Sequence, residues 1–275
     1  MRVLAPFGRR RVAVIGGDDV GAYRVLHVCD LEGPQPWPGQ FYMLAAAERW
    51  GAGADERPFV PRALSFLSAA ATPFGAQARQ LRFMLEDVGP GTRRLCALRA
   101  HDELWLTGPL GNGFELPQEG RRAILAGGGV GIPPLAALSC VLAAADVSAS
   151  AVLGFRDARH AAGARLLGAS VGCALATDDG SVGHHGLVTE LLGGELDDDD
   201  HAVVYSCGPP AMLEAVRAAC QARGVPAQLA LEAGMACGFG ACFGCVVAVR
   251  DGGYVRVCVD GPVLDAARLD VVPAH

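Results

Sequence analysis

The sequence predicts a multidomain chain with an N-terminal antiparallel β-barrel, a central α/β domain built on a parallel sheet, and a small C-terminal module rich in cysteine. Short apolar runs separated by Gly and Pro clusters fill residues 11–116, a rhythm typical of antiparallel barrels. From Arg121 to Arg223, strand-like and helix-like segments alternate, which indicates a doubly wound parallel sheet. A group of cysteines follows. We therefore expect domains at 1–116, 117–228 and 229–275.

The composition fits globular domains and excludes some classes of partner. Of the 275 residues, 51% are hydrophobic and 19% are charged, which is enough apolar material for two cores and a small module. The net charge of -6 gives no basic surface for nucleic acid or an anionic membrane. The apolar run 12–15 is too short for a secretory signal, and Asp146 interrupts the most apolar window, so we expect a cytoplasmic protein without a membrane span.

Apolar runs bounded by turn residues define the expected elements. The six barrel strands are expected at Val12–Ile15, Tyr23–Cys29, Gln40–Ala45, Ala63–Ser68, Leu81–Glu86 and Glu103–Thr107. In the central domain, strands are expected at Ala123–Leu125, Ala149–Phe155, Ala174–Thr177 and Ala202–Cys207. The helices between and after them are expected at Pro133–Ala144, Ala158–Leu167, Leu187–Leu192 and Pro210–Arg223. The acidic stretch Gly193–Asp200 is predicted to be a solvated loop.

The spacing of four cysteines is the most specific motif in the chain. They are Cys237, Cys242, Cys245 and Cys258, spaced C-x4-C-x2-C with twelve residues before the fourth. This is the plant-type ligand pattern of a [2Fe-2S] cluster. The loop must turn its N–H groups toward the sulfurs, and the glycines expected to permit this by positive φ or close approach are Gly238, Gly240 and Gly244. The alternative is a zinc site, although only Cys242 and Cys245 have the spacing of a zinc knuckle.

Two motifs in the barrel region indicate a site for an anionic cofactor. Arg62 can clamp a pyrophosphate through two N–H bonds, and Ser65 can offer its hydroxyl to a flavin ring. Gly89-Pro90-Gly91-Thr92 places Thr92 at the start of a short helix, where backbone N–H groups favour an anion. Taken alone, the first motif favours an ordinary surface arginine and strand serine, and the second fits an N-capped helix as well.

The central domain carries three candidate nucleotide-binding motifs. Gly127-Gly128-Gly129-Val130-Gly131 follows a predicted strand and opens a helix, so its backbone can approach a pyrophosphate, although the spacing is not G-x-G-x-x-G. Cys207 and Gly208 end a later strand and are placed to flank a nicotinamide. Asp178 also ends a strand, where a carboxylate can bind ribose hydroxyls and repel a 2′-phosphate, which favours NAD over NADP. Each motif alone also fits an ordinary turn or helix start.

In this order, the motifs resemble those of the ferredoxin-NADP reductase superfamily, and within it the family of electron transfer subunits of dihydroorotate dehydrogenase B. The likeness extends from about Arg11 to Asp265. It is most specific over Glu232–Cys245 and Cys258–Val263. Gly108–Phe114 resembles the family's link between the two main domains.

The resemblance implies FAD, a [2Fe-2S] cluster and NAD as cofactors. The four cysteines would hold the cluster. FAD would be held by Arg62, Ala63, Leu64, Ser65, Met84, Leu85, Glu86, Gly91 and Thr92. The chain departs from the family at Leu85-Glu86, where members often have an aromatic-basic pair, and has Ala63 where the family has proline. Backbone contacts to the flavin can survive the first change.

The resemblance also implies a function. In the family, electrons from dihydroorotate oxidation on an FMN-bearing catalytic subunit cross the cluster to FAD and then reach NAD⁺. We therefore expect an oxidoreductase subunit of pyrimidine biosynthesis, in a heterotetramer of two plus two chains, that needs no side-chain acid, base or nucleophile. The alternatives are the reductase subunit of another complex, of sulfhydrogenase or ferredoxin:NAD(P) oxidoreductase type, and a degenerate flavodomain whose cysteines bind zinc. His184 and His185 are expected to be solvent-facing loop residues.

Overall fold

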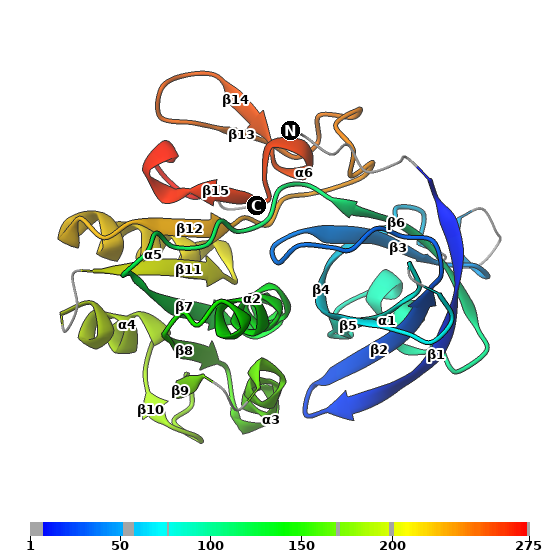
Figure 1. The fold of residues 1–275 in the computed structure, drawn as a ribbon, viewed down its shortest axis with the longest axis horizontal. Helices are drawn as coiled ribbons and strands as arrows, with labels where there is room; N and C mark the ends of the chain where they lie inside the picture. Colours follow the sequence, from blue (N-terminus) through cyan, green and yellow to red (C-terminus); the bar gives the residue numbers. More distant parts are fainter. Residues whose placement is uncertain (1–7, 52–57, 76, 169–170, 198–200, 274–275) are drawn as a thin grey trace.

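The computed structural model describes residues 8–51, 58–75, 77–168, 171–197 and 201–273. Three parts are visible in Figure 1: a barrel, an open sheet flanked by helices, and a C-terminal segment above both. Within the described ranges, no helix combines the length and the apolar character needed to cross a membrane.

The N-terminal part is a closed antiparallel barrel with the strand order β1-β2-β5-β4-β3-β6. Its strands are β1 (Arg10–Val20), β2 (Tyr23–Asp30), β3 (Phe41–Ala46), β4 (Arg62–Ala71), β5 (Arg79–Leu85) and β6 (Glu103–Leu110), with α1 (Pro90–Cys96) between the last two. Alternate positions of the strands face inward, and side chains such as Leu26, Leu81, Phe83, Leu104 and Leu106 are fully buried there. The predicted barrel is therefore confirmed, with the strand ends shifted.

The second part is a seven-stranded sheet with the order β10-β9-β8-β7-β11-β12-β15. Its strands are β7 (Arg122–Gly128), β8 (Ala149–Phe155), β9 (Gly172–Thr177), β10 (His184–His185), β11 (Ala202–Cys207), β12 (Ala227–Ala230) and β15 (Val263–Asp265). All neighbours are parallel except β12 and β15. The sheet is thus mixed at one edge, where the chain expected to form a separate C-terminal module adds a strand.

Helices cover both faces of this sheet, as expected for a doubly wound arrangement (Figure 1). The helical segments are η1 (Gly129–Gly131), α2 (Ile132–Ala144), α3 (Ala158–Ala161), η2 (Ala162–Leu167), α4 (Val188–Asp197) and α5 (Pro210–Arg223). On the barrel side, α2 packs against β4, and its leucines, such as Leu135 and Leu138, are fully buried. On the opposite face, α4 packs against α5.

Two local predictions in the central domain are wrong, and one confirmed helix is mostly of the 3-10 type. The acidic stretch is not a loop throughout: Gly193–Asp197 belongs to α4, and residues 198–200 lie outside the described residues. The reason is that Val188, Leu192 and Leu196 recur every four residues and are all buried, so the apolar helix face continues past the glycines. The expected helix Ala158–Leu167 is one α-helical turn followed by a 3-10 helix. The two histidines form the short strand β10, although both are exposed.

The C-terminal segment connects the other two parts. It contains β13 (Val246–Ala248), β14 (Tyr254–Arg256), α6 (Val257–Asp260), β15 and η3 (Ala266–Arg268). After β6, the Asn112 side chain donates hydrogen bonds to the carbonyls of Val259 and Asp260, both at 3.1 Å. Since β15 pairs with β12, the segment is fixed to the barrel exit on one side and to the sheet on the other.

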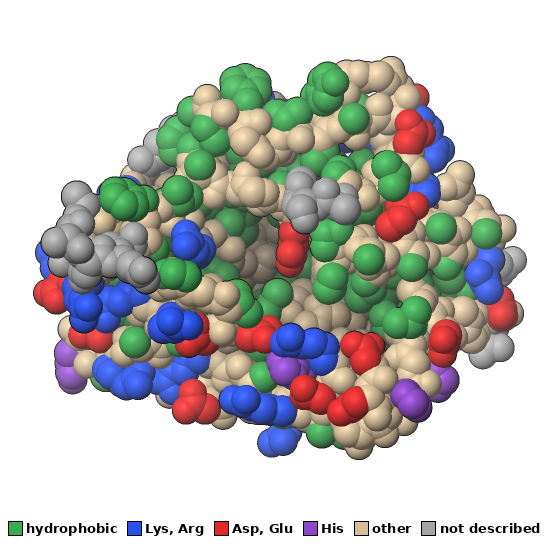
Figure 2. Space-filling model, turned by 180° about the vertical axis from the view of Figure 1, so that it is seen from behind, with side chains coloured by type: hydrophobic (Ala, Val, Ile, Leu, Met, Phe, Trp, Pro, Cys, Tyr) green, Lys and Arg blue, Asp and Glu red, His purple; other side chains and the backbone are tan. Residues whose placement is uncertain are grey.

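Apolar and charged side chains gather in different regions of the molecular surface. Seen from behind, hydrophobic and uncharged atoms dominate the upper region, over the C-terminal segment (Figure 2). Charged side chains of both signs gather over the lower half, and a hollow lies near the middle of this face (Figure 2).

Candidate cluster and cofactor sites

The four candidate cluster ligands lie together in the C-terminal segment. Cys237, Cys242 and Cys245 belong to the loop between β12 and β13, and Cys258 belongs to α6. The Sγ atoms of Cys245 and Cys258 are 3.2 Å apart, and the N–H of Cys258 lies 3.4 Å from Sγ of Cys245. Both residues are nearly inaccessible, at 3% and 2% exposure. One pair of ligands is therefore buried and in contact.

The other pair is Cys237 and Cys242, nearer the surface. Burial disfavours the Cys237 thiolate, but the N–H groups of Phe239 and Cys242 donate to its sulfur, as does the Cys242 thiol, and together they lower the pKa of Cys237 to about 6. In the buried pair, burial and the adjacent Cys245 thiol raise the pKa of Cys258 to about 12. The loop thus aims backbone donors at its sulfurs, as the sequence predicts.

The loop owes this path to positive φ angles, but not all at the expected positions. Gly238 and Gly240 have φ angles of 78° and 86°. Gly244 does not have a positive φ; the third such position is Phe243, at 58°. Gly244 instead lies close to the site, where an added Cβ would be 3.6 Å from Sγ of Cys242. The prediction of positive φ is therefore confirmed for two glycines, whereas at Gly244 neither the φ angle nor the space around it requires glycine.

The donor set suits a two-iron cluster. Its four sulfurs come as two pairs, Cys237 with Cys242 and Cys245 with Cys258. A [2Fe-2S] cluster held by four cysteines takes two thiolates on each iron, so it requires this kind of pairing. Within the described ranges, no three or more His, Cys, Asp or Glu side chains are arranged to hold a single metal ion.

Arg62 and Gly91 are in direct contact at one end of the barrel. Arg62 begins β4, lies 5.7 Å from the ring centre of Trp50, and donates to the carbonyl of Val60. An added Cβ at Gly91 would lie 2.3 Å from Nε of Arg62 and 2.5 Å from its Nη2, so only glycine leaves room for this guanidinium. The structure therefore brings together the two residues that were predicted to hold a pyrophosphate.

The Thr92 side chain stabilises the start of α1. Its Oγ1 accepts hydrogen bonds from the N–H groups of Val88 and Gly89, at 3.0 and 3.2 Å. These contacts satisfy backbone donors at the start of α1, as in a capped helix. Its contact with FAD stays a prediction.

A pocket of about 280 Å³, here called the inner pocket, lies where the three parts of the molecule meet. The barrel contributes four residues that were predicted to hold FAD: Ala63, Leu64, Ser65 and Met84. The sheet contributes Cys207, and the residues leading into the cysteine loop include Glu232 and Met235. Burial raises the pKa of Cys207, so its thiol stays neutral beside this pocket. The inner pocket can accept a flat, largely apolar ring.

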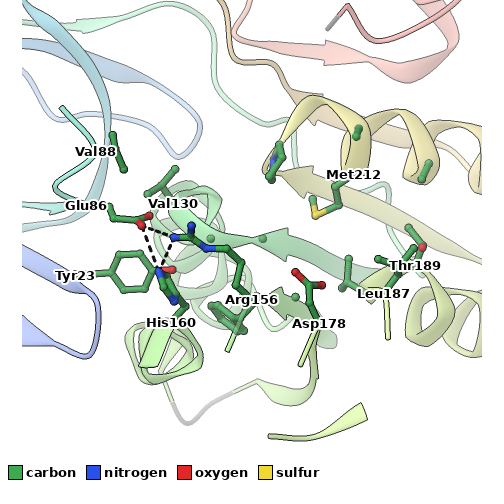
Figure 3. A pocket seen from close by; sticks show the side chains of 18 residues that line it. Tyr23, Glu86, Val88, Val130, Arg156, His160, Asp178, Leu187, Thr189 and Met212 are labelled. Atoms are coloured by element: carbon green, nitrogen blue, oxygen red, sulfur yellow. Dashed lines mark hydrogen bonds and ion pairs between the residues drawn. The ribbon is translucent and has the colours of Figure 1, made fainter. Parts of the chain in front are cut away.

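A second pocket of about 520 Å³, here called the outer pocket, opens between the barrel and the ends of the sheet strands (Figure 3). Gly128, Gly129 and Asp178 line it, as does Met212 of α5. Val130 lines both the inner and the outer pocket, so the two cavities adjoin at the Gly-rich turn. Such a pair of adjoining pockets can hold a dinucleotide with its ring end inside and its ribose near Asp178.

Three other predicted glycines allow neighbouring elements to pack closely. An added Cβ at Gly131 would lie 2.1 Å from the carbonyl oxygen of Cys207, and one at Gly208 would lie 2.6 Å from Met212. An added Cβ at Gly127 would meet Leu135 and Leu153 at 2.7 and 2.9 Å. Gly131 and Gly208 let the turn after β7 approach the end of β11, and Gly127 lets β7 pack closely against α2 and β8. None of the three is among the described residues that line either pocket.

Leu85 and Glu86, both predicted to hold FAD, are not among the described residues that line the inner pocket. Leu85 is 1% exposed and packs inside the barrel. The Glu86 carboxylate instead pairs with two residues of the central domain: its Oε1 lies 2.5 Å from Nη2 of Arg156 and 3.2 Å from Nε2 of His160 (Figure 3). Arg156 was not predicted as a site residue, although it directly follows a predicted strand, in the same position relative to β8 that Asp178 has relative to β9.

Comparisons with known proteins agree with this architecture. A family model described as the iron-sulfur cluster binding domain of dihydroorotate dehydrogenase B matches residues 232–270. The chain resembles a ferredoxin-NADP oxidoreductase that depends on NADH and is described in connection with flavin-based electron bifurcation, with a TM-score of 0.77, 23% identity and coverage of 96% of this chain and 91% of that one. It also resembles a Neisseria gonorrhoeae ferredoxin NADP⁺ reductase solved with FAD and NADP, with a TM-score of 0.62, 18% identity and coverage of 78% and 91%. These likenesses show the fold.

Relatives of higher identity show the family. Two proteins named dihydroorotate dehydrogenase B (NAD(+)), electron transfer subunit, are 36% and 35% identical to the chain. The first, from Caldanaerobacter subterraneus, aligns over 85% of this chain and 87% of its own length. The second, from Geobacillus thermodenitrificans, aligns over 95% and 98%. The chain therefore belongs to the family of electron transfer subunits of dihydroorotate dehydrogenase B (NAD(+)).

Proposed function

We propose that this chain is the electron transfer subunit of an NAD-dependent dihydroorotate dehydrogenase, and that it conducts electrons from an FMN-bearing catalytic partner through a [2Fe-2S] cluster and FAD to NAD⁺. The observation that carries the proposal is the inner pocket. Predicted FAD residues, Cys207 at the end of β11 and the approach to the cysteine loop all line it. Three redox sites next to one another are what a short electron path needs.

The residues of this chain are proposed to bind FAD and to orient its ring. FAD, when bound, exchanges electron pairs with a nicotinamide and single electrons with a cluster. Arg62, lying over Gly91, is placed to hold its pyrophosphate by charge-assisted bonds. Ala63–Ser65 and Met84 form the wall against the ring, with Ser65 as the hydrogen-bonding group. Cys207, a neutral buried thiol, bounds the ring pocket on the side of the sheet.

The nucleotide site is proposed at the outer pocket. Gly128 and Gly129 bring backbone close to the cavity, as a pyrophosphate needs. Asp178 can accept hydrogen bonds from ribose hydroxyls and repels a 2′-phosphate, which favours NAD. Because Val130 lines both pockets, a nicotinamide bound at the outer pocket would lie next to the flavin ring.

The catalytic partner is proposed to dock at the cysteine loop. Cys242 is exposed, and the neighbouring Phe243 is 64% exposed, so the outer pair of ligands faces an accessible apolar surface. A partner's flavin can approach the cluster most closely there. The assembly of two plus two chains, the division of the chain at 1–116, 117–228 and 229–275, and the cytoplasmic location stay predictions from the sequence.

The experiment is to co-purify the chain with the dihydroorotate-oxidising subunit from the same genome and to assay dihydroorotate-dependent NAD⁺ reduction without oxygen. Activity that requires both chains supports the proposal. Failure to associate, with a chain that still oxidises NADH through flavin, would move the assignment to the reductase subunit of another complex. A colourless chain containing stoichiometric zinc would refute electron transfer altogether.

A further inference from the structure

Glu86 and Arg156 form an ion pair across the boundary between the barrel and the central domain. Glu86 follows β5, and Arg156 follows β8. Nη2 of Arg156 lies 2.5 Å from Oε1 of Glu86 and 2.6 Å from Nε2 of His160, and all three side chains converge at one wall of the outer pocket (Figure 3). The Glu86 side chain is 19% exposed and the Arg156 side chain 64%.

The hydrogen-bond pattern sets the charges in this group. Arginine has only donors, so in its contact with Arg156 the His160 Nε2 accepts. The other ring nitrogen, Nδ1, lies 2.7 Å from Oδ1 of Asp157, where an N–H can donate. The carboxylate in direct contact with Arg156 is that of Glu86.

The pair decides the electrostatic character of the outer pocket. Among the described residues that line it, the carboxylates are Glu86 and Asp178, and Arg156 is the one arginine or lysine. An arginine without a carboxylate partner on this wall would attract phosphate groups strongly. With Glu86 in place, that positive charge is balanced and Asp178 remains as an uncompensated negative charge in the lining.

We propose that Glu86 is a specificity-determining residue for NAD over NADP, because it neutralises Arg156 and so denies the pocket a cation for the extra 2′-phosphate. This inference rests on the proposed function, in which the outer pocket binds a pyridine dinucleotide. The Asp178 carboxylate disfavours the 2′-phosphate by repulsion. Glu86 disfavours it by neutralising the Arg156 charge that would otherwise attract it.

The rival explanation is that the ion pair only holds the two domains together. That boundary has other contacts: the N–H of Ala22 donates to the carbonyl of Arg159 at 3.1 Å, and the rings of Tyr23 and His160 meet edge to face at 5.7 Å. A Glu86→Gln variant keeps these contacts and the shape of the side chain. It should fold, and it removes the charge alone.

The test uses the FAD- and cluster-loaded protein and compares the binding of 5′-AMP with that of adenosine 2′,5′-bisphosphate by calorimetry. For Glu86→Gln we expect affinity for the bisphosphate to rise about three- to tenfold, while affinity for 5′-AMP changes much less. The ratio of NADPH to NADH turnover should shift in the same direction. Glu103→Gln is the matched control, since Glu103 pairs with Arg11 at an exposed position on the barrel and does not line the pocket.

A second variant identifies the source of the effect. Adding Arg156→Gln to Glu86→Gln should erase the gain for the bisphosphate, because the freed cation is then gone. Equal changes for both ligands, or no change for either, would overturn the inference and leave the pair as an interdomain contact. If neither NADH nor 5′-AMP binds the wild-type chain, the outer pocket is not the nucleotide site, and the proposed function fails with the inference.

Discussion

Residues 62 and 91 illustrate how closely one side chain can depend on another. The Arg62 guanidinium occupies space that any side chain at position 91 would need. From the sequence, both residues could be assigned to one anion site by their motifs, although Arg62 and Gly91 lie on separate elements. Their contact depends on how β4 and α1 meet, which periodicity alone does not encode.

Gly91→Ala should displace Arg62 and weaken FAD retention by about ten- to hundredfold, because charge-assisted bonds to the pyrophosphate are lost. Flavin content after desalting, with circular dichroism to verify folding, measures this. Gly89→Ala is the control, since an added Cβ there meets nothing within 4 Å and the backbone is extended. Equal flavin loss in both variants would remove Arg62 from the site.

Cys242→Ser should abolish the cluster while leaving FAD bound, because it removes one predicted cluster ligand and none of the residues predicted to hold FAD. Iron and acid-labile sulfide analysis, together with the visible spectrum, measures the outcome. Cys140→Ser, at an exposed cysteine on α2, should change neither. A Cys242→Ser protein with full iron and sulfide would show that the cluster ligands are assigned wrongly.

Met84 and Leu85 are neighbours on β5, but their side chains lie in different surroundings. The resemblance assigned Met84 and Leu85 together to FAD, yet neighbouring strand residues point to opposite faces. The structure places Met84 at the inner pocket and Leu85 in the barrel core. Only Met84 lines that pocket, and strand alternation alone could not say which face the pocket would occupy.

Among the secondary-structure elements, most strands and helices could be predicted from the spacing of apolar residues. The main error came from giving the charge and glycine content of one stretch more weight than the spacing of its apolar residues. The acidic stretch after Leu192 favoured a loop by its charge and glycines. The helix continues through this stretch because Val188, Leu192 and Leu196 lie on one apolar face. Their burial against the sheet and α5 offsets the low helix propensity of Gly193 and Gly194.

Gly194→Ala should therefore stabilise the protein by about 0.5–1 kcal/mol, because alanine is the better helix former at an exposed helical position with free space. The free energy of unfolding by chemical denaturation measures it. Gly224→Ala is the contrasting variant: Gly224 ends α5 with φ at 67°, so alanine there should destabilise. A loss of stability in Gly194→Ala would contradict a helix through this position.

At the scale of the whole molecule, the order of the parts was predictable and their joining was not. The barrel could be predicted from short apolar runs separated by turn residues, and the sheet from alternating strand-like and helix-like segments. The cysteine loop could be predicted from its spacing motif. Strand β15 has three residues, too few for a periodic signal, and it is held by backbone pairing with β12. That pairing and the hydrogen bonds of Asn112 fix the segment that carries Cys258 against the other two parts.

The inner pocket depends on this joining, because residues from all three parts line it. We therefore expect an electron path between FAD and the cluster within this one chain. The measurement that tests it most directly is anaerobic addition of NADH to the isolated, FAD-loaded chain, followed by low-temperature electron paramagnetic resonance. We expect NADH to produce the signal of a reduced [2Fe-2S] cluster, in an amount comparable to the FAD content. Flavin bleaching by NADH without that signal, in a protein with full iron and sulfide, would contradict the account.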